Sequence, residues 1–327
     1  MTGVSDSFDR PINYLRISVT DRCNLRCIYC MPLEGIETLA HADILRYEEV
    51  LSVARAAAEI GINKVRLTGG EPLVRARLIE LVKMLSSVPG LDDLSLTTNG
   101  ILLNQYADEL KAAGLNRVNV SLDSLKSDKL KQITRFGSLS EVMEGIETAR
   151  RAGLNPVKIN MVTMRGVNDD EIIDFARKTI DEEWHVRYIE FMPIGENQQE
   201  GKDRFISISQ IAERIETLGT LQPHKLDGNG PAKYYRLPGA RGTIGFISPV
   251  SEHFCFQCNR LRLTADGKLR PCLLSDDEID LREPLRQGAS IDDLKALLRQ
   301  AIASKPECHH LKIGATAKNR SMCQIGG

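Results

Sequence analysis

The features that mark membrane, secreted or nucleic-acid-binding proteins are missing from this chain of 327 residues. No stretch reaches the length of a membrane-spanning helix, and no basic region followed by an apolar run marks a secretory signal. The net charge is only −1 and aromatic residues make up 5%, so neither a basic surface nor a platform for stacking bases is predicted. We expect a cytoplasmic globular protein with one large domain, or one domain plus an extension.

The eight cysteines are the unusual part of the composition. Without a secretory signal they indicate metal ligands in a reducing compartment and argue against a disulfide framework. Cys23, Cys27 and Cys30 form a C-x3-C-x2-C motif. Three thiolates on one loop can hold three corners of a four-iron, four-sulfur cluster and leave one iron open, whereas ferredoxin clusters take four cysteines. A zinc knuckle is the alternative, but zinc needs a nearby fourth ligand, and His41 lies eleven residues on.

Short apolar segments alternate with amphipathic ones from residue 14 to about 194. The predicted strands are Tyr14–Thr20, Lys64–Thr68, Asp93–Thr97, Arg117–Asp123, Pro156–Met164 and His185–Met192. The predicted helices between them are Tyr47–Ile60, Arg77–Ser87, Asn104–Ala113, Ser140–Ala152 and Asp169–Asp181. Strands that alternate with helices in this way predict a parallel sheet or barrel.

One face of the first five predicted strands is polar, because side chains alternate along a strand. The polar set is Arg16, Ser18, Thr20, Lys64, Arg66, Thr68, Ser95, Thr97, Asn99, Asn119, Ser121, Asp123, Lys158 and Asn160. A filled barrel has an apolar interior, and a doubly wound sheet is apolar on both faces. We therefore predict an α/β fold with an incomplete (β/α)6 TIM-like barrel over residues 1–196, whose polar face lines a solvated cavity.

The predicted cavity is basic, since Arg16, Arg66 and Lys158 point into it if the alternation holds. Unpaired buried cations are costly, so an anionic ligand is the simplest explanation. Phosphate esters are favoured because the guanidinium group matches phosphate geometry. Internal pairing with Asp123 or Glu190 is the alternative.

The loops that follow the predicted strands share one rim of the sheet, where parallel α/β folds bind ligands. In the segment Gly69-Gly70-Glu71-Pro72 the two glycines allow close backbone approach, and Glu71 offers an acceptor for an ammonium group. The other rim segments are the cysteine loop, Thr97–Gly100, Ser121–Ser124 and Glu190–Gly195. Their shared location is stronger evidence than any one of them.

Residues 197–327 differ in composition and are predicted to form a C-terminal extension. Helices are expected at Ser209–Leu218 and at Ser290–Ser304, the second capped by Ser290. A hairpin turn is predicted at residues 265–267.

A second set of three cysteines, Cys255, Cys258 and Cys272, lies in this extension with C-x2-C-x13-C spacing. The spacing lacks the repeated C-x2-C of a zinc ribbon and favours a second cluster with one open iron. Arg260 and Arg262 share a strand face beside it and suit an anion. The competing interpretation is a zinc site completed by Cys308, His309 or His310. Otherwise Cys308 and Cys323 have no partner at ligand spacing and are interpreted as ordinary thiols.

The first cysteine motif together with Gly69-Gly70-Glu71-Pro72 resembles the radical S-adenosylmethionine superfamily. With the second cysteine set, Arg260, Arg262 and the terminal Gly326-Gly327, the chain more closely resembles the GTP 3′,8-cyclase family of molybdenum cofactor biosynthesis. The resemblance covers the chain from Arg16 to Gly327. The first motif by itself indicates only the superfamily.

The resemblance implies two [4Fe-4S] clusters, held by the two cysteine sets, with S-adenosylmethionine on the open iron of the first and guanine on the open iron of the second. It implies cofactor contacts from Tyr29, Gly70, Glu71, Ser121 and Met192. It implies contacts to GTP from Arg16, Arg66, Thr97, Lys158, Arg260, Leu261, Arg262, Gly326 and Gly327. The diglycine tail is expected to reach into the active site.

The reaction implied by the resemblance is the cyclisation of GTP to (8S)-3′,8-cyclo-7,8-dihydroguanosine 5′-triphosphate. A 5′-deoxyadenosyl radical takes hydrogen from the ribose 3′ carbon, and the substrate radical attacks carbon 8 of guanine. A reductant, a homodimer and a downstream cyclic pyranopterin monophosphate synthase are the expected partners, with no nucleic acid or membrane. Two alternatives remain: a peptide-modifying radical S-adenosylmethionine maturase with an auxiliary cluster, and a zinc-binding adaptor.

Overall fold

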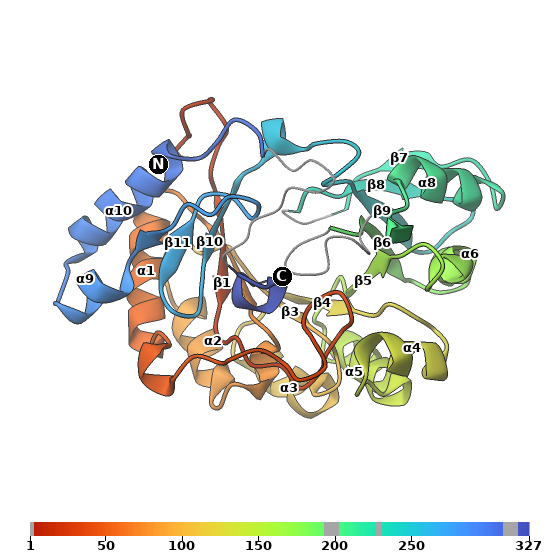
Figure 1. Ribbon diagram of the computed structural model, residues 1–327, viewed down its shortest axis with the longest axis horizontal. Coiled ribbons are helices and arrows are strands. Elements are labelled where there is room, and N and C mark those ends of the chain that lie inside the picture. Colours follow the sequence, from red (N-terminus) through yellow and green to blue (C-terminus); the bar gives the residue numbers. More distant parts are fainter. Residues whose placement is uncertain (1–2, 193–202, 227–229, 310–319, 327) are drawn as a thin grey trace.

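The computed structural model is built around one curved sheet of twelve strands (Figure 1). The structure describes residues 3–192, 203–226, 230–309 and 320–326. The strands are β1 (Tyr14–Ser18), β2 (Lys64–Thr68), β3 (Asp93–Thr98), β4 (Arg117–Ser121), β5 (Lys158–Thr163), β6 (His185–Glu190), β7 (Gln222–His224), β8 (Lys233–Arg236), β9 (Thr243–Ile247), β10 (Arg260–Leu263), β11 (Lys268–Arg270) and β12 (Ile279–Asp280). Their order across the sheet is β12-β11-β10-β1-β2-β3-β4-β5-β6-β9-β8-β7.

Helices cover the outer side of this sheet (Figure 1). The α-helices are α1 (Tyr47–Glu59), α2 (Leu78–Ser86), α3 (Leu103–Ala112), α4 (Ser127–Thr134), α5 (Leu139–Arg151), α6 (Ile172–Asp181), α8 (Ile208–Glu216), α9 (Arg282–Arg286) and α10 (Ile291–Ala303). The 3₁₀ turns are η1 (His41–Asp43), η2 (Pro72–Val74), η3 (Asp169–Glu171), η4 (Cys255–Gln257) and η5 (Met322–Gln324). Within the described ranges, no helix is long and apolar enough to span a membrane.

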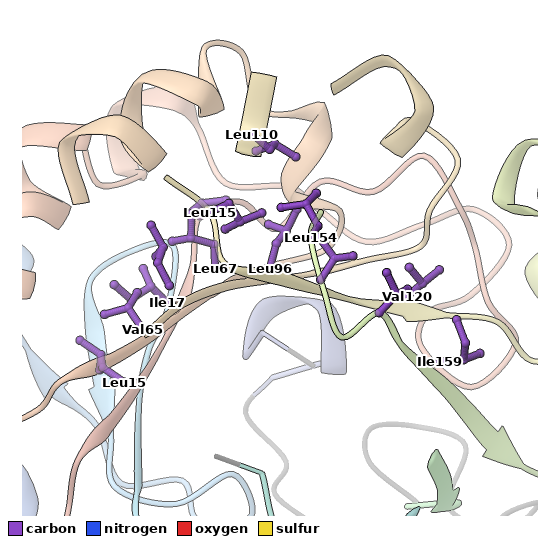
Figure 2. Packing of buried hydrophobic residues seen from close by; sticks show 14 of the residues in the cluster. Leu15, Ile17, Val65, Leu67, Leu96, Leu110, Leu115, Val120, Leu154 and Ile159 are labelled. Carbon is purple, nitrogen blue, oxygen red and sulfur yellow. The ribbon is translucent and has the colours of Figure 1, made fainter. Parts of the chain in front are cut away.

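The main hydrophobic core lies between the outer face of the sheet and these helices. Figure 2 shows Leu15, Ile17, Val65 and Leu67 of β1 and β2 on the helical side, together with Leu110 at the end of α3. These side chains are fully buried. The apolar half of the alternating pattern therefore faces the helices, and the polar half is left for the inside of the curve.

The parallel register sets the polar residues of neighbouring strands side by side. Arg16 of β1 is paired with Arg66 of β2 on one side and with Arg262 of β10 on the other. Farther along the sheet, Asn160 of β5 is paired with Arg187 of β6. Residues paired across adjacent strands point to the same face, so the register brings guanidinium groups from four strands to the inner face.

The six strands predicted from the alternating pattern are confirmed, with ends that differ by at most two residues. The helices before residue 190 are also confirmed within one residue at each end, except that Asp169–Asp181 begins as η3. The short helix α4 was not predicted, because its only buried side chains are Leu130, Ile133 and Thr134. Ser290 caps α10 as expected, since its hydroxyl accepts a hydrogen bond from the amide of Asp293 at 3.2 Å.

The parallel sheet extends beyond the six predicted strands. Strand β10 pairs in parallel with β1, and β9 pairs in parallel with β6. Both come from the region after residue 197, so this region lengthens the sheet at both of its edges. The predicted division at residues 196 and 197 lies outside the described residues. The predicted hairpin turn is confirmed, since β10 and β11 pair in antiparallel fashion around it.

Candidate functional site

The loop that carries Cys23, Cys27 and Cys30 follows β1 at the rim of the sheet. Its backbone is held by the end of α4, because the amide of Ile28 donates to the carbonyl of Ile133 at 2.9 Å. The amide of Cys30 in turn donates to the carbonyl of Cys27 at 2.9 Å. The three thiols are partly buried on one compact loop, and burial raises the pKa of Cys23 to about 11.

The two glycines after β2 lie against the backbone of this cysteine loop. The amide of Gly70 donates to the carbonyl of Thr20 at 2.8 Å, and that of Glu71 donates to the carbonyl of Arg22 at 2.8 Å. A Cβ atom on Gly70 would lie 2.4 Å from the carbonyl oxygen of Arg22. The close approach expected of these glycines is confirmed, and its target is the cysteine loop.

Glu71 is buried, and its carboxylate already has partners. Oε1 accepts from the amide of Leu73 and from the hydroxyl of Thr98, and Oε2 accepts from the amide of Asn99. Burial raises the pKa of Glu71 to about 7. Glu71 therefore joins the glycine turn to the loop after β3. Its predicted contact with an ammonium group stays a prediction.

Tyr29 and Asp123 link the cysteine loop to β4 and β5. The Tyr29 hydroxyl donates to Asp123 Oδ2 at 2.7 Å, and the amide of Val162 donates to Asp123 Oδ1 at 2.8 Å. Burial raises the pKa of Asp123 to about 6, although both hydrogen bonds act to lower it. Tyr29, which stands between Cys27 and Cys30 in the chain, is thus tied to the residue that follows β4 and lines a cavity inside the sheet's curve.

A cavity of about 240 Å³ occupies the inside of the sheet's curve. Predicted site residues that line it are Arg16, Tyr29, Arg66, Thr97, Ser121, Met192, Cys255, Cys258, Arg260, Arg262 and Cys272. The basic polar cavity expected from strand alternation is therefore confirmed. It joins the rim of β1 to the second cysteine set.

Two of the arginines in this cavity, Arg16 and Arg66, have no carboxylate partner among the described residues. Within the described part of the chain, Arg16 and Arg66 form no ion pair, and Arg66 Nε donates instead to Ser95 Oγ at 3.1 Å. Burial, together with the neighbouring Arg262, holds the pKa of Arg16 well below its ordinary value. Asp123 and Glu190 are occupied by other donors, so the alternative of internal pairing with them is wrong for both arginines.

Arg187 of β6 also lines the cavity, although it was not among the predicted site residues. Its Nη2 donates to Asn119 Oδ1 at 2.7 Å, which joins β6 to β4 across the inner face. The alternation was followed through the first five strands only. Continued into β6, it places His185, Arg187 and Ile189 on the polar face, so the signal was present.

Three of the predicted substrate residues, Lys158, Leu261 and Gly326, are not among the residues that line the cavity. Lys158 is buried with its Nζ 5.5 Å from the ring of Tyr234, and burial with Arg187 lowers its pKa to about 6. The side chain of Leu261 lies in the hydrophobic core, because alternation along β10 turns it away from Arg260 and Arg262. A contact from the Leu261 side chain is therefore ruled out.

The end of the chain returns into the site, where η5 lies inside the curve of the sheet (dark blue in Figure 1). The carbonyl of Gly326 accepts from Arg16 Nη2 at 2.9 Å, from Thr68 Oγ1 at 3.1 Å and from Arg262 Nη1 at 3.5 Å. The positive φ of Gly326, 76°, is one that glycine adopts readily. The tail contact implied by the resemblance is present for Gly326, and Gly327 lies outside the described residues.

The second cysteine set lies at the other side of the cavity and is surrounded by cations. Lys305 Nζ donates to the carbonyls of Arg260 and Pro271, at 2.9 and 2.6 Å, which ties together the segments that carry Cys258 and Cys272. Burial acts to raise the pKa of Cys258, but Arg260 and Lys305 lower it to about 6. Cys258 is thus favoured as a thiolate, whereas burial raises the pKa of Cys272.

Cys308 and Cys323 each lie beside one of the two sets, which their positions in the sequence did not predict. The Cys308 thiol neighbours that of Cys255, and the Cys323 thiol neighbours that of Cys30. Spacing along the chain gives no signal for either, because both come from a segment that returns to the site only in the fold. Among the described residues, no three His, Cys, Asp or Glu side chains converge closely enough to hold a single metal ion.

Two protein families match consecutive regions of the chain. Residues 17–179 match the Radical SAM superfamily, and residues 184–311 match the family described as Molybdenum Cofactor Synthesis C. The chain is 54% identical over 326 residues to the GTP 3′,8-cyclase of Pelotomaculum thermopropionicum, covering 99% of this chain and 100% of that one. It is 53% identical over 325 residues to the GTP 3′,8-cyclase of Moorella thermoacetica, again covering 99% and 100%.

A solved structure shares the fold at low sequence identity. Streptococcus suis SuiB bound to S-adenosylmethionine superposes with a TM-score of 0.61 at 13% identity, covering 93% of this chain and 77% of that one. The likeness supports the α/β arrangement of a radical S-adenosylmethionine fold.

Gly70→Ala is expected to destabilise the protein by about 1–3 kcal/mol, because the new methyl group must displace the backbone of the cysteine loop. The measurement is the free energy of unfolding by chemical denaturation under anaerobic conditions. Gly3→Ala is the matched control, since a Cβ there meets nothing within 4 Å. Equal stabilities of the two variants would show that the glycine turn does not rest on the loop as described.

Asp123→Asn is expected to change how stability depends on pH. The folded-state pKa of Asp123 is raised from 3.8 to about 6, so its contribution to stability is present below pH 3.8 and is lost as pH rises through 6. Asparagine does not titrate, so the variant should gain stability relative to the parent by up to roughly 3 kcal/mol between about pH 4 and 7. Denaturation curves at several pH values measure this difference.

The control for this prediction is Asp170→Asn. Asp170 is half exposed, and hydrogen bonds from Lys129 and Lys126 lower its pKa to about 2, so any pH effect has the opposite sign and is small. Parallel pH profiles for Asp123→Asn and the parent protein would contradict the raised pKa of Asp123.

Proposed function

The chain belongs to the GTP 3′,8-cyclase family of the radical S-adenosylmethionine superfamily, and we propose that its cavity holds GTP between two iron–sulfur clusters. The protein is accordingly an enzyme that cyclises GTP in molybdenum cofactor biosynthesis. This membership sets aside the peptide-modifying maturase and the zinc-binding adaptor. The cavity on the inner face of the sheet is the proposed location of the reaction.

The observation that carries the assignment is the row of guanidinium groups on adjacent strands. Arg262, Arg16 and Arg66 lie in register on β10, β1 and β2, and all three line the cavity. A triphosphate would supply the anionic oxygens that Arg16 and Arg66 lack within the described residues. Arg260 and Thr97 extend the same wall and complete the proposed nucleotide site.

The first cluster and S-adenosylmethionine, when bound, supply the one-electron radical chemistry of the superfamily. Cys23, Cys27 and Cys30 fit the cluster by their donor type and by their position on one loop at the rim. The amide contacts of Gly70 and Glu71 hold that loop in place. Tyr29, Ser121 and Met192 line the cavity beside it and are proposed to orient the cofactor.

The protein's own contribution is positioning. The Tyr29–Asp123 hydrogen bond fixes the cofactor side of the cavity, and the Arg187–Asn119 bond fixes the opposite strand. Gly326 adds a carbonyl between Arg16 and Arg262 on the nucleotide side. A reactive radical needs its target held within near-attack distance, which explains why so many polar anchors face one small cavity.

A second [4Fe-4S] cluster on Cys255, Cys258 and Cys272 is part of the proposal. All three thiols line the cavity, and the cations around them balance the negative charge that thiolates and a cluster bring. The proposal also includes a barrel built on the six βα units, with residues 197–327 as its extension. The enzyme is proposed to be a cytoplasmic homodimer. It is proposed to use an external reductant and to pass its product to a downstream cyclic pyranopterin monophosphate synthase.

Iron analysis tests the two clusters. Anaerobic protein should contain about eight irons per chain, and replacing Cys255, Cys258 and Cys272 together by alanine should leave about four. The complementary replacement of Cys23, Cys27 and Cys30 should also leave about four and should abolish cleavage of S-adenosylmethionine. A parent protein with one or two zincs and little iron would overturn the assignment of both sets.

Turnover under anaerobic conditions tests the reaction and the nucleotide site. With GTP, S-adenosylmethionine and dithionite, the products should be 5′-deoxyadenosine and the cyclised nucleotide. Arg260→Ala and Arg262→Ala should raise the KM for GTP roughly 10- to 100-fold, because each removes charge-assisted hydrogen bonds to an anion. Uncoupled cleavage of S-adenosylmethionine should persist in both variants.

Arg299→Ala is the matched control, since Arg299 is exposed on α10 and lies away from the cavity. It should leave both products and the KM unchanged. If Arg260→Ala and Arg262→Ala behave like Arg299→Ala, the nucleotide does not bind along this wall.

A further inference from the structure

Two cysteines lie outside the two three-cysteine sets, and both come from the segment that closes the chain. Cys308 joins the second set through Cys255, and Cys323 joins the first set through Cys30. The proposed clusters use three cysteines each, so these two thiols have no assigned role.

Cys323 is buried beside the first set. It lies on η5, is only 2% exposed, and its thiol neighbours that of Cys30. Ser321 Oγ lies 3.2 Å from its Sγ atom. It is also close enough to Cys23 to act on that thiol electrostatically. Its neighbour Met322 lines the cavity.

The chain is anchored on both sides of Cys323, so its place does not depend on the thiol itself. Before it, Arg320 forms ion pairs with Asp266 at 2.8 Å and Glu278 at 2.6 Å. After it, the carbonyl of Gly326 is bound by Arg16 and by Thr68. The fold therefore holds a further thiol beside Cys30, near Cys23, on the inner side of the sheet.

We propose that Cys323 is the fourth ligand of the first cluster in the enzyme without S-adenosylmethionine, and that S-adenosylmethionine displaces it from the open iron. The inference rests on the proposed function, since it requires that cluster. Cysteine thiolates are the ordinary ligands of such irons. The exchange needs no oxidant or reductant: the thiol gives up its proton when it binds iron and takes one up when it is released.

Cys308 does not have this role for the second cluster. Its only thiol neighbour among the described residues is Cys255. It is also partly exposed, whereas Cys323 is enclosed. Cys308 therefore provides a matched control, as the other thiol that lies outside both motifs.

A bound Cys323 thiolate lowers the apparent affinity for S-adenosylmethionine, because only the fraction of enzyme with an open iron can bind it. The nucleotide acts in the opposite direction. If the nucleotide binds Arg16 and Arg262 in place of the Gly326 carbonyl, the C-terminal tail loses two of its contacts and the Cys323 thiolate is released from the iron. GTP should then tighten the binding of S-adenosylmethionine, and by linkage the reverse holds.

The test compares Cys323→Ser with the parent and with Cys308→Ser, all as anaerobic, iron-loaded full-length enzyme. Serine keeps the size and hydrogen bonding of the buried thiol but is a poor iron ligand. We expect Cys323→Ser to bind S-adenosylmethionine roughly tenfold more tightly than the parent. This corresponds to a parent in which the first cluster has an open iron in about a tenth of the molecules. The EPR spectrum of the reduced cluster should differ from the parent without S-adenosylmethionine and coincide with it when S-adenosylmethionine is bound. Cys308→Ser should match the parent in both.

Mössbauer spectra of the ⁵⁷Fe-loaded parent give a second readout that does not depend on any variant. Without S-adenosylmethionine, about one iron in eight, the open iron of the second cluster, should differ from the cysteine-bound irons. With S-adenosylmethionine bound, the open iron of the first cluster should differ as well, which makes about two in eight. Two distinct irons without S-adenosylmethionine, or a Cys323→Ser enzyme with the parent's affinity and spectrum, would overturn the inference while leaving the proposed function intact. A parent enzyme without iron or without cleavage of S-adenosylmethionine would overturn both.

Discussion

Like charges on neighbouring strands are the constraint around which this protein is built. The parallel register places Arg262, Arg16 and Arg66 side by side on the inner face, and burial with mutual repulsion lowers the pKa of Arg16. Such a row is unfavourable without an anion or a dipole to balance it. The Gly326 carbonyl supplies one dipole in the free enzyme, and the triphosphate of the substrate would supply the full compensating charge.

The C-terminal third of the chain completes this arrangement and is not a separate attachment. Strand β10 brings Arg262 beside Arg16, and β9 extends the opposite edge next to β6. Lys305, just after α10, joins the backbone beside Arg260 to that beside Cys272. The cavity therefore needs both parts of the chain. Arg16 and Arg262, which lie side by side in its lining, are more than two hundred positions apart in the sequence.

Local patterning predicted the parts of the site that regular strands supply. Alternation placed Arg16, Arg66 and Ser121 on the inner face. Continued into β6 it would also have placed Arg187 there, but this residue was recognised only in the fold. It failed for Lys158, because a strand residue can point inward and still be covered by a later segment, here the one that carries Tyr234. No periodicity could place Cys308, Cys323 or Gly326, since irregular segments are positioned by long-range contacts such as those of Arg320.

Cys23 of the first set and Cys258 of the second differ in their electrostatic surroundings, and the difference agrees with separate roles. Burial raises the pKa of Cys23, and the nearby carboxylate of Glu71 acts in the same direction. Arg260 and Lys305 instead lower the pKa of Cys258. A cluster on the first set would lie in low-polarity surroundings beside the proposed cofactor residues, which suits the protection of a radical from water. A cluster on the second set would share its cations with a bound anion, so iron and arginines there would hold one nucleotide together.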